Sequence, residues 1–189
     1  MKKLLVVLAF TFFQLSVAQE NNTVSVFHRL LIYNSENEIM LVKIKGKGAE
    51  VWVTPGIYQD SNQFVKKGLD DLVKTYGIET SNPKLKGVFS VQYENDEKKE
   101  MWLRNYYTCK YIKGDIHFPK NQPFTVSEIK WVSLEKSQEM LSHEFVKLML
   151  EQTHNNPDIV SGGSIRVLKE NDKVKVKIEE EFYPLFYKN

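Results

Sequence analysis

The chain has 189 residues, of which 42% are hydrophobic and 12% aromatic, a composition that supports one full hydrophobic core and excludes an intrinsically disordered protein. Its 26 Lys and Arg residues nearly balance 24 Asp and Glu residues, which argues against nucleic acid as the main partner, because phosphate binding requires a basic surplus or a basic patch. The single cysteine, Cys109, excludes an intramolecular disulfide.

The first 18 residues have the organisation of a signal peptide. A basic start at Lys2 and Lys3 precedes an apolar run, residues 4–13, and the small residues Ser16 and Ala18 mark a cleavage site. We therefore predict export to a secreted or periplasmic location, with cleavage after Ala18. The apolar run is shorter than the about 20 residues that span a membrane, so no membrane span is expected after its removal. Removing two of the 26 basic residues leaves 24, equal to the acidic count, so the mature chain is neutral.

The next segment predicts a hairpin followed by a helix. Two β-rich runs, residues 24–33 and 39–44, flank a polar turn. The helix follows a turn at Pro55-Gly56 and has apolar residues at helical spacing, namely Val65, Leu69, Leu72, Val73 and Tyr76. We expect Ser61 at its N-cap and Gly77 at its C-cap. Its opposite, polar side carries Lys67, Asp71, Lys74 and Thr75.

A second hairpin is predicted from residues 84–94 and 100–112, which are joined by a charged turn. Side chains alternate between the two faces of a strand, so Trp102 and Tyr106 share one face and Tyr107 lies on the other. These aromatic residues either fill the core or line a pocket. Cys109 lies in the same alternating run and is expected to be a buried thiol.

The last third of the chain predicts a loop, a strand, a helical region and a hairpin. The loop covers residues 112–123, and the strand reads EIKWVSL. The helical region begins at Ser133 with Glu135 and extends to about Gln152. Residues 161–164, Ser-Gly-Gly-Ser, are expected to form a loop before alternating Val and Ile residues predict a terminal hairpin.

The stretch from Val51 to Ile78 resembles a Nudix box. The Nudix pattern is Gly, five residues, Glu, seven residues, Arg-Glu, an apolar residue, any residue, Glu-Glu, any residue, Gly and an apolar residue. The chain matches it at Gly56, Leu72, Gly77 and Ile78. The remaining positions depart from it, with Asn62 for the first Glu, Asp70 for Arg, Asp71 for the next Glu, and Lys74 and Thr75 for the Glu-Glu pair. The later segment SEIKWVSLEK also resembles the sequence that follows the last core strand in many Nudix domains.

This resemblance implies an α+β fold, an α/β/α sandwich in which a mixed β-sheet lies between helices. It covers about residues 24–152, the core of a single domain over residues 19–189, and leaves the terminal hairpin, residues 164–186, as an extension. In the family, the carboxylates of the box helix bind Mg²⁺, which requires oxygen ligands and neutralises a diphosphate. Only Asp71 keeps a carboxylate here, and Lys74 at i+3 makes an ion pair its simpler role.

Three functions remain open from the sequence. The first is an exported, catalytically inactive Nudix-like protein that binds a small ligand, phosphorylated or not, or a protein partner in the former substrate groove; no cofactor is expected. Its candidate ligand-binding residues are Gly56, Lys67, Lys74, Trp102 and Tyr106. The second is a working, Mg²⁺-dependent hydrolase of nucleoside-diphosphate-linked or other phosphorylated compounds. Its candidate catalytic residues are Asp71, which is also the candidate metal ligand, Glu94 and Glu128. The third is an interaction protein without a ligand.

Overall fold

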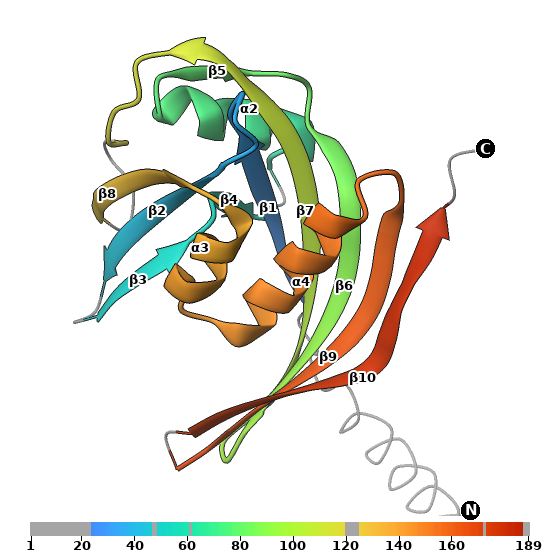
Figure 1. The fold of residues 1–189 in the computed structure, drawn as a ribbon. Helices are drawn as coiled ribbons and strands as arrows, with labels where there is room; N and C mark the ends of the chain where they lie inside the picture. The colour runs from blue at the N-terminus through green and yellow to red at the C-terminus, as the bar shows by residue number, and fades with distance from the viewer. Residues whose placement is uncertain (1–23, 47–48, 61, 120–124, 172, 187–189) are drawn as a thin grey trace, which may run out of the picture.

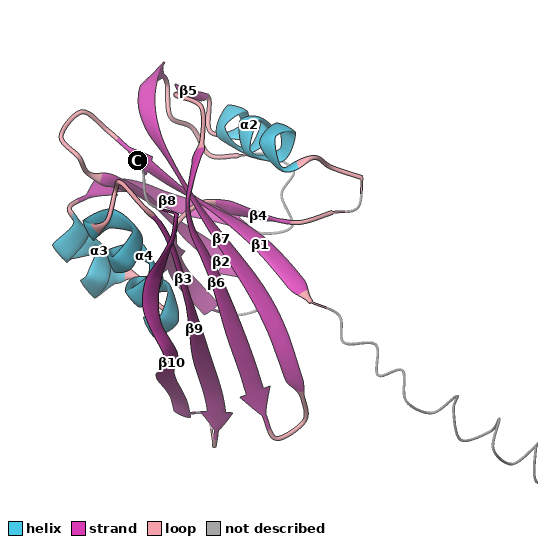
Figure 2. Cartoon of the chain, turned by 90° about the vertical axis from the view of Figure 1, so that its right-hand side faces the viewer, coloured by secondary structure: helices cyan, strands magenta, loops and turns pink. Residues whose placement is uncertain are grey.

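The computed structural model describes residues 24–46, 49–60, 62–119, 125–171 and 173–186. These residues form one mixed β-sheet with helices on both of its faces (Figure 1). Figure 2 shows α2 (Val65–Thr75) on one side of the sheet and α3 (Leu134–Met140) and α4 (Glu144–Asn155) on the other. The α/β/α sandwich implied by the sequence is therefore confirmed. The predicted signal peptide lies outside the described residues.

Ten described strands make up the sheet. They are β1 (Ser25–Tyr33), β2 (Ile39–Gly46), β3 (Ala49–Val53), β4 (Gly56–Tyr58), β5 (Ile78–Thr80), β6 (Lys84–Asn95), β7 (Lys99–Gly114), β8 (Thr125–Val132), β9 (Val160–Glu170) and β10 (Lys173–Phe186). The main path runs β10-β9-β6-β7-β1-β2-β3, while β4 pairs with β1, β5 with β7 and β8 with β2. The pairs β1/β7 and β6/β9 are parallel and the others are antiparallel.

The predicted hairpins are present, but they differ in how many residues their two strands pair. Strands β6 and β7 pair along most of their length, and so do β9 and β10. Strands β1 and β2 meet only at Tyr33 and Ile39, and β1 instead pairs over nine residues with β7. The terminal hairpin extends the sheet, because β9 joins β6 and places β10 at the outer edge.

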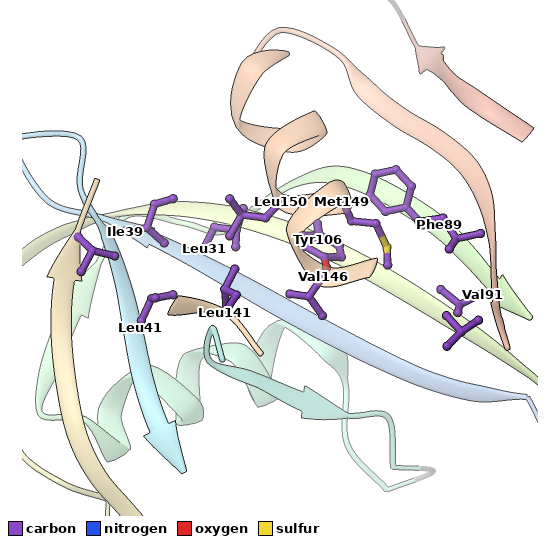
Figure 3. Packing of buried hydrophobic residues seen from close by; sticks show 13 residues of the cluster. Leu31, Ile39, Leu41, Phe89, Val91, Tyr106, Leu141, Val146, Met149 and Leu150 are labelled. Carbon is purple, nitrogen blue, oxygen red and sulfur yellow. The ribbon is translucent and has the colours of Figure 1, made fainter. Parts of the chain in front are cut away.

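Alternating side chains of the central strands supply two separate cores. Leu30 and Ile32 of β1 are fully buried with the apolar stripe of α2, which is confirmed by the burial of Leu69, Leu72, Val73 and Tyr76. Leu31 is fully buried on the other face, under α4 (Figure 3). Each large apolar side chain buried in this way contributes about 1.5–3 kcal/mol relative to exposure. The two cores fix which face of the sheet each helix covers.

The helical region predicted from Glu135 to Gln152 is two helices, so that prediction was wrong in its continuity. Ser133, where the helical region was predicted to begin, is the N-cap of α3 and accepts a hydrogen bond from the Lys136 amide at 3.1 Å. The chain then leaves helical geometry at Leu141, with ψ of 134°. Ser142 instead pairs with β3: its amide donates to the Trp52 carbonyl at 3.3 Å, and its Oγ accepts from the Trp52 amide at 3.1 Å. This contact fixes the start of α4 beside β3.

Residues 161–164 are part of β9 rather than the predicted loop. Two adjacent glycines suggest a loop because glycine weakens a strand. In β9 the absence of a side chain on these glycines leaves space for two aromatic rings. A Cβ on Gly162 would lie 2.8 Å from the Tyr183 ring, and one on Gly163 would lie 2.6 Å from the Phe182 ring. Two boundaries also differ from expectation, since β7 extends to Gly114 and α2 begins at Val65 with Phe64, not Ser61, at its N-cap.

Candidate functional site

The box segment keeps its backbone frame. Gly77 follows α2 with φ of 74°, the left-handed conformation that glycine adopts without strain, and its amide donates to the Lys74 carbonyl at 3.0 Å. Gly56 begins β4, where a Cβ would overlap the Phe27 ring and lie 2.7 Å from the His28 carbonyl oxygen. The two matched glycines therefore have structural reasons to be present, and Gly56 has no side chain with which to select a ligand.

The polar side of α2 forms ion pairs with itself. Asp71 pairs with Lys67 one turn before it and with Lys74, at 3.9 Å, one turn after it. The hydrogen bond from Lys67 is the main cause that holds the pKa of Asp71 below its usual range. Asp70 is paired in the same way with Lys66 at 2.7 Å. The predicted ion pair of Asp71 with Lys74 is confirmed, and the only carboxylate at a matching Glu position of the box is already neutralised.

The other candidate carboxylates lie on different elements. Glu94, near the end of β6, pairs with Lys99 at 2.8 Å, and Glu128 on β8 pairs with Lys130 at 2.6 Å. Across the described ranges, no three His, Cys, Asp or Glu side chains are placed to share a metal ion. A single, ion-paired Asp71 does not fit Mg²⁺, which requires several oxygen ligands in octahedral geometry. No catalytic step through a metal follows from these residues.

A different set of polar side chains is buried on the opposite face of the sheet, which α3 and α4 cover. In the parallel register of β1 and β7, Phe27 lies beside Arg104 and Arg29 lies beside Tyr106. Paired residues of a sheet project to the same face, so two arginines and two aromatic residues alternate on one surface. Arg29 is 7% exposed and Arg104 6% exposed. We call Phe27, Arg29, Trp102, Arg104 and Tyr106 the arginine cluster.

Each guanidinium is held by its Nη1 atom. Arg29 Nη1 donates to Thr54 Oγ1 at 2.9 Å and to the Thr54 carbonyl at 3.4 Å. Arg104 Nη1 donates to the carbonyls of Ser25 at 3.1 Å and Leu103 at 3.2 Å. No carboxylate of the described residues forms a salt bridge with either arginine, although a buried charge ordinarily requires a partner. Burial, with the nearby Arg29 charge, lowers the pKa of Arg104 to about 10.

Aromatic rings surround these cations. The Arg29 guanidinium carbon lies 5.0 Å from the Phe27 ring centre and 5.9 Å from that of Tyr106, and the Arg104 carbon lies 4.8 Å from that of Trp102. Such cation–π contacts contribute only about 0.5–2 kcal/mol each, less than a buried charge loses in desolvation. The Trp102 ring also lies 6.2 Å from Phe145 in the first turn of α4.

The predicted ligand-binding residues fall into two groups on opposite faces. Trp102 and Tyr106 share one face with each other, as predicted, and belong to the arginine cluster, whereas Lys67 and Lys74 lie on α2 and Gly56 is at the edge of β4. Tyr107 faces the α2 core, and Cys109 is the buried thiol expected from the sequence. Sequence analysis missed Arg29 and Arg104. Their signal was present, since each arginine occupies an inward position between apolar residues in an alternating strand.

Solved structures with this arrangement are Nudix proteins. A MutT protein from Bacillus halodurans is 16% identical, with a TM-score of 0.60 over 82% of this chain and 97% of that one. A MutT protein from Methanosarcina mazei is 21% identical, with a TM-score of 0.53 over 72% and 96%. An ADP-ribose pyrophosphatase from Streptococcus suis is 15% identical, with a TM-score of 0.52 over 78% and 100%. No family model and no curated protein matches the sequence.

These likenesses establish the fold: the chain has the Nudix α/β/α sandwich. At identities of 15–21%, they do not extend to activity. None of the described helices has the length and apolarity of a membrane span.

Proposed function

We propose that this chain is an exported Nudix-fold protein that binds a small anionic ligand through the arginine cluster and does not hydrolyse it by a metal-dependent reaction. The observation that carries the proposal is the burial of Arg29 and Arg104 without a carboxylate partner. Leaving two buried cations uncompensated is costly, and an anion that enters from outside would compensate them.

The box helix supports binding without turnover. Hydrolysis of a diphosphate requires a cation that neutralises the leaving group and a base that activates water. Asp71 is the only carboxylate at a Glu position of the box, and it forms ion pairs with Lys67 and Lys74. The box helix is α2, which packs on one face of the sheet. The arginine cluster lies on the other face, which α3 and α4 cover. An anion held by the arginines is therefore separated by the sheet from the box helix.

Phosphate-release assays test the absence of turnover. We expect no release above background from ADP-ribose, nucleotide sugars or nucleoside triphosphates with Mg²⁺ or Mn²⁺ present. The matched variant is Asp71→Ala, which removes the one box carboxylate. Metal-dependent release that Asp71→Ala abolishes would refute the proposal, and release that survives this change would direct attention to Glu94 or Glu128.

Export is tested separately. A basic start, a short apolar run and small residues at positions 16 and 18 support removal of residues 1–18. Mass spectrometry of the protein from its native host should therefore find Gln19 at the N-terminus. A protein that retains Met1 and stays in the cytosol would contradict this part of the proposal.

A further inference from the structure

We propose that the anion bound by the arginine cluster is a terminal phosphate, the dianionic group of a phosphate monoester. This inference rests on the proposed function and narrows it to one class of ligand. Three features support it: hydrogen-bond donors of Arg29 and Tyr106 without a described partner, the two positive charges of Arg29 and Arg104, and the N-terminal end of α4.

The first observation is the hydrogen bonding of the two guanidinium groups. The hydrogen bonds that Arg29 and Arg104 donate to described oxygens come from Nη1, and none comes from the Nε–Nη2 edge. That edge is the one that binds carboxylate or phosphate oxygens in pairs. Arg29 Nε is fully buried and has no partner. An orphan donor of this kind is rare in folded proteins, and a ligand oxygen would satisfy it.

Tyr106 supplies a third donor directly beside Arg29. Its side chain is fully buried and lies among the core residues beneath α4 (Figure 3). Among the described residues, its hydroxyl has no hydrogen-bond partner in ordinary geometry. Burial raises the pKa of the phenol, so the proton remains on the oxygen. Arg29 and Tyr106 are paired in the strand register, and therefore the two orphan groups come from neighbouring positions on one face. A tetrahedral group with several oxygens can accept from both and from Arg104 as well.

Charge selects among the possible anions. The Phe27 ring centre lies 5.0 Å from the Arg29 guanidinium carbon and 5.9 Å from that of Arg104, so both positive charges border the same ring. A carboxylate or a phosphodiester carries one negative charge and would neutralise one of them. A phosphate monoester carries about −1.5 to −2 at neutral pH. It alone among these three groups offsets both guanidinium charges.

The start of α4 adds a favourable field. Its N-cap, His143, forms no side-chain capping bond. The His143 ring lies 5.6 Å from the Phe145 ring, which lies 6.2 Å from the Trp102 ring, so this helix end borders the arginine cluster. The twelve-residue helix has a partial positive charge at this end. Glu144 in the same turn is paired with Lys147 at 3.4 Å. An anion in the arginine cluster is thus approached by three sources of positive potential.

Calorimetric titration of the mature chain tests the assignment with four probes: phenyl phosphate, diphenyl phosphate, benzoate and inorganic phosphate. We expect phenyl phosphate to bind with 1:1 stoichiometry, and diphenyl phosphate and benzoate to bind at least ~10-fold more weakly, because each leaves one buried charge unpaired. Inorganic phosphate that binds as tightly as phenyl phosphate identifies free phosphate as the ligand, whereas tighter phenyl phosphate identifies an organic monoester. Equal or tighter binding of benzoate or the diester overturns the inference and leaves the proposed anion binding intact.

Variants locate the site. Arg104→Met should weaken phenyl phosphate ~10-fold or more, since it removes a charge-assisted pair, and Tyr106→Phe should weaken it by a smaller factor. Arg104→Lys keeps the charge and loses the paired edge, and it serves if the Met variant does not fold. Lys66→Met, which removes one charge from α2 on the opposite face, is the matched control and should leave affinity unchanged. Full binding of phenyl phosphate by both Arg104 variants overturns the inference.

Discussion

Replacing Arg104 with Met should make the ligand-free protein more stable. Lowering the pKa of Arg104 from 12.5 to about 10 means that the folded state disfavours the guanidinium charge at pH 7. At 1.36 kcal/mol per pKa unit this amounts to about 3 kcal/mol, which we reduce to about 2 kcal/mol for partial contact with solvent. The lost hydrogen bonds to Ser25 and Leu103 and the lost contact with the Trp102 ring together offset about 1 kcal/mol of this. The expected net gain is therefore about 1 kcal/mol.

Such a gain raises the melting temperature by about 2–4 °C in a chain of this size. Differential scanning calorimetry at pH 7 in phosphate-free buffer would measure it. Adding phenyl phosphate should raise the melting temperature of the native protein more than that of Arg104→Met, so that the ligand narrows or reverses the difference between them. The destabilisation of the native protein by the Arg104 charge should also decrease as the pH rises above about 10. In that range Arg104 loses its proton in the folded state but keeps it in the unfolded state.

A lower melting temperature for Arg104→Met in the absence of ligand would refute this reasoning. It would mean that the hydrogen bonds and ring contacts of the guanidinium outweigh the loss of hydration, so that Arg104 is a structural residue. Arg104→Lys is the control, because it retains a buried charge without the planar donor edge. Its melting temperature should not exceed that of the native protein.

Three further predictions concern other parts of the fold. Lys74→Glu combined with Thr75→Glu should raise Mg²⁺ affinity in calorimetric titrations, because it adds oxygen ligands near Asp71; native protein that binds Mg²⁺ equally tightly would contradict the loss of metal ligands. Cys109 should resist alkylation at pH 8 until the protein is unfolded, since burial raises its pKa to about 11 and keeps the thiol protonated; rapid labelling of the folded protein would be the contrary result. Gly163→Ala should cost about 1–3 kcal/mol in denaturant unfolding, because φ is 156° and the new Cβ would meet the Phe182 ring; an unchanged midpoint would show that β9 can shift.

Local patterns predicted the parts of the fold that depend on local periodicity. The apolar stripe from Leu69 to Tyr76 predicted α2, and alternation placed Trp102 and Tyr106 together, because burial imposes these spacings directly. The parallel pairing of β1 with β7 was not predicted, since nothing within either strand identifies a parallel partner so distant in sequence. The continuity of residues 135–152 was wrong because the contact of Ser142 with Trp52 of β3 interrupts the helix.

The candidate site was predicted only in part. The Nudix-box pattern identified Asp71, Lys67 and Lys74, which form ion pairs on an exposed helix face. The arginines were overlooked because a charged residue in a strand is ordinarily solvated. They lie on the face of the sheet that α4, residues 144–155, helps to cover, and the sequence of a strand does not show which helix covers it.

The parallel pairs also determine when the chain can fold. His28 of β1 and Asn105 of β7 are 77 residues apart, and Ser90 of β6 and Ser164 of β9 are 74 apart. Contacts of such separation close slowly, because long loops must be ordered before any pairing stabilises them. During synthesis, β1 has only β4 and a single position of β2 as partners until β7 emerges. A chain truncated before β9 would leave the edge of β6 open to pairing with other chains, so truncation should lead to aggregation rather than to a smaller folded unit.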